Sequence, residues 1–235
     1  MKKFFVLTLM MMMICATTFA EELKVPTISV SGEGVVEVAP DRATVTLGVV
    51  TREKNPAAVQ NSNARAAQSV INSIVALGVE RRNITTGNYN FSPTYRHHND
   101  GRTELDGYEA VNSVTVIVDD LSIVGKIIDA ALKNGANRVD DLSFGLRNKT
   151  AYQDEALRLA ILDAKRKAEV AARALGKNIL GVCNVSINSA SVIAPRNYKM
   201  SRAMTEDAAV GLETPVEGGT LNCSASVHVE FEISR

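Results

Sequence analysis

The sequence predicts an α+β fold in which a mainly antiparallel sheet is layered with helices. Stretches with an apolar residue at every second position, typical of half-buried strands, alternate with longer stretches that have the period of amphipathic helices. One unit also recurs, an apolar helix that ends at a glycine and is followed at once by a strand: IVALGVERRNITT, AALKNGANRVDDLSF and ARALGKNILGVCNVSI. This recurrence indicates several helices along the same sheet and argues against a doubly wound parallel sheet.

Two alternating runs, 27–39 and 42–51, begin the patterned part of the chain. Between them stands Pro40-Asp41, a pair of residues suited to a tight reversal. We therefore expect these two strands to form a β-hairpin.

Three helices are expected after this hairpin, at 56–77, 121–134 and 150–175. Asn55 and Pro56 are typical of a helix N-cap and of the first helical position. The core face of the third helix is mainly alanine, which allows a close approach to a sheet or to another helix. Further strands are expected at 83–95, 107–118, 138–147, 181–188 and 220–233.

Residues 189–219, between the last two strands, show no convincing periodicity. A segment of this length inside a compact domain is usually a disordered excursion or a functional arm. We expect a long irregular segment within one domain that covers residues 21–235.

The stretch SGEG, with Gly32 and Gly34, raises the question of a phosphate-binding loop. A dinucleotide fingerprint needs a third glycine and a helix directly after it, and a Walker loop needs Gly-Lys-Ser/Thr. The sequence has neither, because a second strand follows SGEG. The two glycines therefore predict a bulge or a close approach of another backbone.

The first twenty residues, MKKFFVLTLMMMMICATTFA, have the pattern of a secretory signal peptide, with cleavage expected after Ala20. We therefore expect a periplasmic protein. No later run reaches the roughly 18 apolar residues of a transmembrane helix, so only peripheral contact with the envelope is expected. The 26 Lys+Arg and 26 Asp+Glu residues balance, which gives no indication of nucleic-acid binding.

Two cysteines, Cys183 and Cys223, follow the predicted signal peptide, and each stands in an alternating apolar run. In an oxidising compartment a disulfide between them is one interpretation, and two buried thiols are the other. Both stay open, because a disulfide depends on the distance between the two Cα atoms.

Motifs of known catalytic chemistry are missing from the sequence: it has no G-x-S-x-G, H-E-x-x-H or C-x-x-C. His97, His98 and Asp100 share one polar loop, but a zinc site needs more ligands, so we expect a solvated hairpin tip. We expect no catalytic residue, no cofactor and no metal, and hence no enzyme.

Four aromatic residues stand in the strands on either side of this loop: Tyr89, Phe91, Tyr95 and Tyr108. Strands favour aromatic residues, so we expect ordinary strand positions. The alternative is that these side chains line a groove for a ligand.

Five stretches follow one another along the chain: VSGEGVVEVAPDRATVTLGV, NITTGNYNFSPTY, GYEAVNSVTVIVDDLSIVGKIIDAALKNGANRVDDLSFGL, EALRLAILDAKRKAEVAARALG and ASVHVEFEI. In order and spacing they resemble the SIMPL-domain family of exported bacterial proteins, which includes periplasmic immunogenic proteins and proteins labelled as oxidative-stress defence. The resemblance implies an α/β fold, a periplasmic location and, for some members, assembly into large ring-like homo-oligomers. It carries over no catalytic residue.

We therefore expect a non-enzymatic periplasmic homo-oligomer, linked to envelope or oxidative-stress tolerance. One alternative is a binding module for a small ligand or an envelope component. Another is an oxidant scavenger that uses Met200 and Met204.

Overall fold

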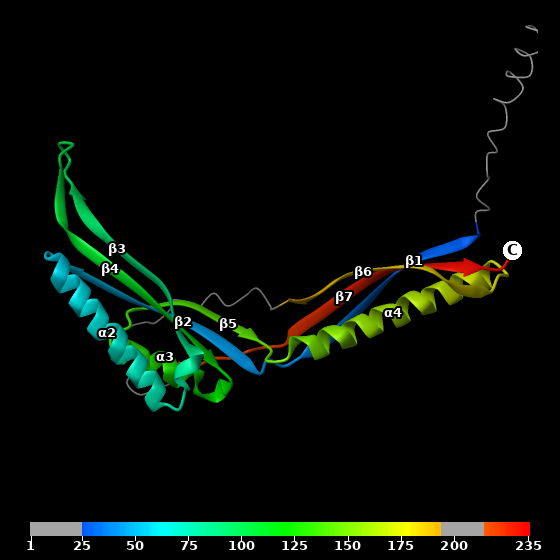
Figure 1. The fold of residues 1–235 in the computed structure, drawn as a ribbon, viewed down its shortest axis with the longest axis horizontal. Coiled ribbons are helices and arrows are strands. Elements are labelled where there is room, and N and C mark those ends of the chain that lie inside the picture. The colour runs from blue at the N-terminus through cyan, green and yellow to red at the C-terminus, as the bar shows by residue number, and fades with distance from the viewer. Residues whose placement is uncertain (1–24, 194–213) are drawn as a thin grey trace, which may run out of the picture.

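The computed structural model describes residues 25–193 and 214–235. Within these residues the chain forms an α+β fold with two antiparallel sheets, which confirms the predicted fold class. Figure 1 shows an elongated molecule in which the two sheets lie end to end, each with its own helices. The predicted signal peptide, Met200 and Met204 lie outside the described residues.

Sheet A has the strand order β1–β7–β6, with β1 at Thr27–Val38, β7 at Leu221–Ile233 and β6 at Ile179–Ile193. Helix α4 (Lys149–Ala174) packs against this sheet. Its buried residues are all alanines and recur at every fourth position: Ala156, Ala160, Ala164, Ala168 and Ala172. Such small side chains let the helix approach the strands closely, as the sequence predicted.

Sheet B has the strand order β3–β4–β2–β5. These strands span Ile84–His97 (β3), Thr103–Val118 (β4), Arg42–Glu53 (β2) and Arg138–Gly145 (β5). Its helices are α2 (Pro56–Ala76) and α3 (Val124–Lys133), with short 3₁₀ turns at Arg81–Asn83 (η1) and Leu121–Ile123 (η2). Asn55 caps α2 as predicted, because its side chain accepts hydrogen bonds from two backbone N–H groups of the first turn.

The glycines of SGEG mark a close approach of two backbones, as predicted. A Cβ atom added to Gly32 would lie 2.0 Å from the carbonyl oxygen of Ala160, and one added to Gly34 would lie 2.0 Å from that of Ala156. The obstacle is the backbone of α4, which cannot move aside as a flexible side chain could. Strand β1 therefore passes directly over α4, and SGEG is a packing motif of sheet A.

Two topological predictions are wrong. β1 and β2 do not form a hairpin, because β1 pairs with β7 whereas β2 pairs with β4 and β5. Pro40-Asp41 is instead the corner at which the chain passes from sheet A to sheet B. The helices also do not all lie along one sheet, since α2 and α3 pack on sheet B and α4 on sheet A. Alternation identifies a strand, but tertiary packing decides its partner.

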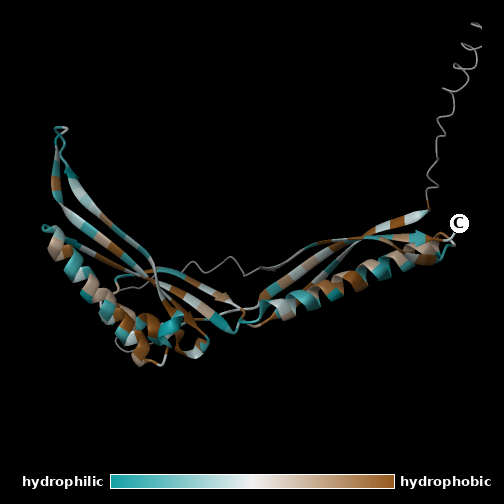
Figure 2. Cartoon of the chain, viewed as in Figure 1, coloured by the Kyte–Doolittle hydropathy of each residue, from teal (hydrophilic) through white to brown (hydrophobic). Residues whose placement is uncertain are grey.

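Each sheet has its own hydrophobic core, and the two cores share no residue. Valine and isoleucine dominate the core of sheet B, whereas the core of sheet A combines the alanines of α4 with the inward face of β7. Bands of apolar and polar residues alternate along the strands of both sheets (Figure 2).

The largest difference from the predicted boundaries concerns β6. This strand reaches Ile193 and so extends into the segment 189–219 that the sequence indicated as irregular. Residues 214–220 have neither helix nor strand, and residues 194–213 lie outside the described residues.

Candidate functional site

Helix α4 leaves much of the helix-facing side of β6 exposed. Val182 is paired with Phe231, and Ile187 is paired with Val227, so the members of each pair point to the same face of sheet A. Phe231 and Val227 on β7 are 6% and 1% exposed, whereas Val182 and Ile187 on β6 are 57% and 56% exposed. The helix therefore shields β7 but leaves Val182 and Ile187 of β6 exposed.

Side chains of α4 show that the helix lies toward the β1 side of the sheet. The N–H of Glu33 donates to Asp163 Oδ2 at 3.1 Å, and Lys167 Nζ donates to the carbonyl oxygen of Ser31 at 3.0 Å. Ile161 stands two positions before Asp163, which places it about 200° around the helix and therefore on the β6 side. We define the β6 surface as the exposed side chains of Ile161, Leu180, Val182, Val185 and Ile187.

The same contacts cap the outer edge of β1, and ion pairs around Asp163 strengthen this cap. Lys167 Nζ lies 2.7 Å from Asp163 Oδ2, and Arg166 lies 2.6 Å from Asp163 Oδ1. Together with the N–H of Glu33, these two cations hold the pKa of Asp163 well below its usual range. The outward backbone groups of Ser31 and Glu33 are thus occupied, which blocks the addition of another strand there.

The outer edge of β6 differs from that of β1 in charge. Ile179–Ile193 contains no charged residue. Each of the other edge strands, β1, β3 and β5, carries at least one charged side chain. Charges on edge strands commonly prevent unwanted pairing, so β6 is the edge most open to a partner.

The aromatic candidates Tyr89, Phe91, Tyr95 and Tyr108 all lie on the β3–β4 hairpin, whose tip extends beyond α2 (Figure 1). The ring of Phe91 stacks on that of Tyr108, with centroids 5.7 Å apart. Tyr89, Phe91 and Tyr95 are largely exposed. The hairpin therefore brings the four side chains onto one arm, and their role as ligand contacts stays a prediction.

Cys183 and Cys223 are both free thiols and are not brought together. Cys223 is paired with Val192 in β6, whereas Cys183 follows Val182, whose partner is Phe231. Eight positions along β7 correspond to about 26 Å, far beyond the roughly 7 Å that a disulfide allows between Cα atoms. Cys223 is buried and Cys183 is exposed, and desolvation raises the pKa of both thiols.

A pocket of about 260 Å³ lies between β5 and residues 214–217. This segment is held at both ends. Thr214 donates to the carboxylate of Asp129 through its N–H at 3.2 Å and its Oγ1 at 2.6 Å. Gly218 lies so close to Pro40 that a Cβ atom there would be 2.6 Å from the proline ring. The pocket is therefore preformed by the fold.

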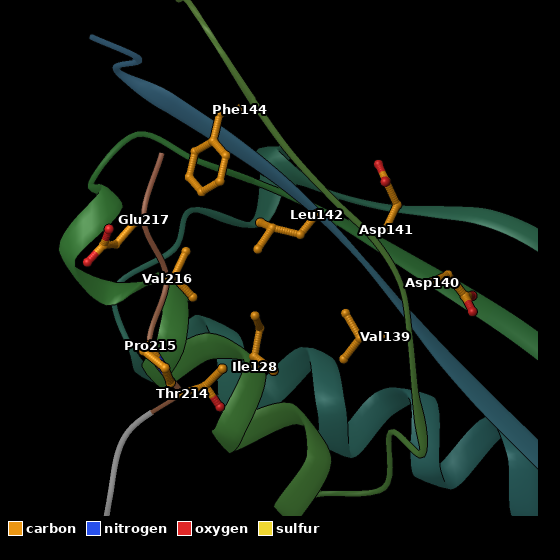
Figure 3. Close-up of a pocket in the computed structure, with 10 residues that line it drawn as sticks. All are labelled: Ile128, Val139, Asp140, Asp141, Leu142, Phe144, Thr214, Pro215, Val216 and Glu217. Carbon is orange, nitrogen blue, oxygen red and sulfur yellow. The ribbon is translucent and has the colours of Figure 1, made fainter. Parts of the chain in front are cut away.

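Figure 3 shows Ile128, Leu142 and Val216 pointing toward one another across this pocket, from α3, β5 and the returning segment. The carboxylates of Asp141 and Glu217 point away from its centre and stand at the rim. No cationic residue lines the pocket among the described residues. Its chemistry suits an apolar group that carries a positive charge at the rim, and it disfavours an anion.

The predicted hairpin tip holds no cluster of metal ligands. His97 Nδ1 lies 3.1 Å from Thr103 Oγ1, and His98 Nε2 lies 3.3 Å from a carboxylate oxygen of Glu104. Nowhere in residues 25–193 and 214–235 do three or more His, Cys, Asp or Glu side chains gather as metal ligands do. Over the same residues, each helix is too short or too polar to cross a bilayer.

Sequence reasoning missed both the β6 surface and the pocket. A signal for the β6 surface was present, because fifteen successive residues from Ile179 to Ile193 carry no charge. The pocket had no local signal, since it arises where residues 214–217 return to sheet B from a distant part of the chain.

The fold defines a class of protein: an α+β protein whose described residues form two antiparallel sheets. The model of the SIMPL family, described as a protein of unknown function (DUF541), matches residues 28–231. The chain therefore belongs to the SIMPL family.

Several relatives share most of their length with this chain. A 26 kDa periplasmic immunogenic protein of Brucella melitensis biotype 1 is 31% identical over 227 residues, which cover 92% of this chain and 89% of the relative. The uncharacterized protein YggE of Escherichia coli K12 is 30% identical over 214 residues (88% and 83%), and that of Edwardsiella ictaluri is 26% identical over 216 residues (92% and 90%). The Brucella name states a periplasmic location, and none of these names states a reaction.

Proposed function

We propose that this protein is a non-enzymatic periplasmic component that works as a homo-oligomer, linked to envelope or oxidative-stress tolerance. The observation that supports assembly is the β6 surface. Contiguous exposed apolar side chains mark interaction sites more often than single ones do. Covering each of these side chains would contribute on the order of 1 kcal/mol.

A second copy of the chain is the partner that the charges favour. Strand β6 carries no charge, so two β6 surfaces can face each other without like-charge repulsion. A partner recognised through ion pairs would find no counter-charge on this strand.

Native mass is the direct test. Protein purified from the periplasm should scatter light as an assembly larger than one chain at micromolar concentration. A single-chain mass under these conditions would contradict the proposal. Intact mass spectrometry of the same sample checks whether cleavage occurs after Ala20.

The link to tolerance has a genetic test. A strain that lacks the gene should survive an oxidant or envelope challenge less well, and the wild-type gene should restore survival. A variant that folds but stays monomeric should fail to restore it. If a monomeric variant restored survival fully, the tolerance would not depend on assembly.

The pocket beside β5 favours a second candidate function, a binding module for an amphipathic cation. We expect a short alkyltrimethylammonium to raise the melting temperature, since a ligand that binds only the folded state stabilises it. An alkyl sulfate of equal chain length should raise it less, because Asp141 and Glu217 stand at the rim.

A variant that fills the pocket provides the control for this test. Val216→Trp should abolish the stabilisation by the cation while leaving the native mass unchanged. Equal stabilisation by the two amphiphiles, or full stabilisation of Val216→Trp, would argue against this pocket as the binding site.

A further inference from the structure

We infer that β6 pairs with β6 of a second copy as antiparallel strands, about a two-fold axis at Ser186. This inference rests on the proposed self-assembly and specifies its interface. It joins two copies of sheet A into one continuous sheet through the edge that the chain leaves open.

We choose the β6 edge because the other edge strands of the two sheets are protected against the addition of a further strand. Sheet A has two edges, and α4 occupies the backbone of β1 through Asp163 and Lys167. Sheet B ends in β3 and β5, which carry charged residues such as Arg96 and Arg138. Strand β6 is an edge strand that combines a neutral sequence with exposed apolar side chains, and this combination permits strand addition.

The register follows from the irregularities of β6. Its pairing with β7 shifts between Val182 and Asn184, and again between Asn188 and Ser191. The five residues from Asn184 to Asn188 lie between these shifts and pair regularly with β7. A regularly paired stretch without a bulge is where a further strand can add its hydrogen bonds, and Ser186 is the centre of this stretch.

A two-fold axis at Ser186 places side chains of the same chemical kind opposite each other. Val185 then faces Ile187 of the second copy on the helix side of the sheet, and Asn184 faces Asn188 of the second copy on the other side. Apolar side chains meet apolar ones and amides meet amides. Because the contact is isologous, each such pair occurs twice.

A disulfide test reads this register directly. Directly opposite residues have Cβ atoms about 5 Å apart, so Ser186→Cys in a Cys183→Ser background should form a disulfide-linked dimer on mild oxidation. Ser29→Cys on the capped β1 edge should stay unlinked and is the matched control. In the wild type, each Cys183 stands three positions from the axis, so the two thiols should lie about 20 Å apart and stay unlinked.

Introducing a charge into β6 tests whether the proposed interface stabilises the assembly. Ile187→Lys should lower the native mass, because it places two like charges across the axis. Val35→Lys, at an exposed valine on β1, should leave the mass unchanged. Circular dichroism checks that both variants are folded.

The outcomes separate this inference from the proposed function. Loss of mass in Ile187→Lys together with a Ser186→Cys dimer supports pairing through β6. An assembly that survives Ile187→Lys and gives no Ser186→Cys dimer overturns the β6 interface but leaves self-assembly standing. Wild-type protein of single-chain mass overturns both.

Discussion

Gly32 and Gly34 decide how closely sheet A and α4 can approach. Their spacing of two residues places both on the same face of β1, and the facing alanines of α4 recur at every fourth position. Neither glycine is needed for an unusual backbone conformation, because neither has a positive φ. Each is required because the carbonyl oxygens of α4 occupy the space of a side chain.

We predict that Gly34→Ala destabilises the protein by about 1–3 kcal/mol, the usual cost of overpacking. The added Cβ would meet the backbone of Ala156, so β1 and α4 must separate. Urea denaturation followed by circular dichroism measures the effect. Gly181→Ala, a strand glycine of the same sheet with nothing within 4 Å of an added Cβ, is the control and should leave the midpoint nearly unchanged.

Asp163 predicts a pH dependence of stability. The two cations and the N–H of Glu33 lower its pKa in the folded state, so its carboxylate stabilises the fold above the unfolded pKa of about 4. This contribution is lost as the pH falls from there toward the lowered folded pKa.

The midpoint of denaturation should therefore be higher for the wild type than for Asp163→Asn at pH 7, and the two should converge in acid. Asp154→Asn, an exposed position of the same helix, should match the wild type at every pH. A constant difference between Asp163→Asn and the wild type across the titration would refute the electrostatic role.

Elements were predicted well from the sequence, because each one depends on a local pattern. Asn55-Pro56 marked the start of α2, and the alternation of 220–233 marked β7. The pairing of strands with one another was predicted less well. The hairpin expected around Pro40-Asp41 failed because the pairing of β1 with β7 joins residues about 200 positions apart, for which the sequence holds no local signal.

The packing of α4 as an element depends on its alanine face, and this dependence can be tested by mutation. Ala160→Leu should destabilise the protein by about 1–3 kcal/mol, because the larger side chain has no space between α4 and β1. Ala174→Leu, an exposed site in the last turn of the same helix, should have little effect. Thermal melts of both variants make the comparison, and equal melting temperatures would show that α4 does not need its small side chains.

For the whole molecule, the sequence indicated several helices along one sheet, whereas the structure has two sheets with separate cores. This difference also explains why the candidate site was missed. The apolar residues of β6 looked like core residues in sequence, and only the position of α4 over β1 and β7 shows that they are exposed. Exposure of this kind depends on which helix covers which strand.

Separate cores predict that the two sheets respond independently to core mutations. Ile74→Ala empties space under sheet B and should cost about 2–5 kcal/mol, and Phe231→Ala does the same under sheet A at about 3–5 kcal/mol. Local opening free energies are read by hydrogen exchange. Ile74→Ala should therefore speed exchange in α2, β2 and β4 while α4 and β7 keep their protection, and Phe231→Ala should do the reverse. Faster exchange throughout the chain in either variant would mean that the two sheets unfold as one unit.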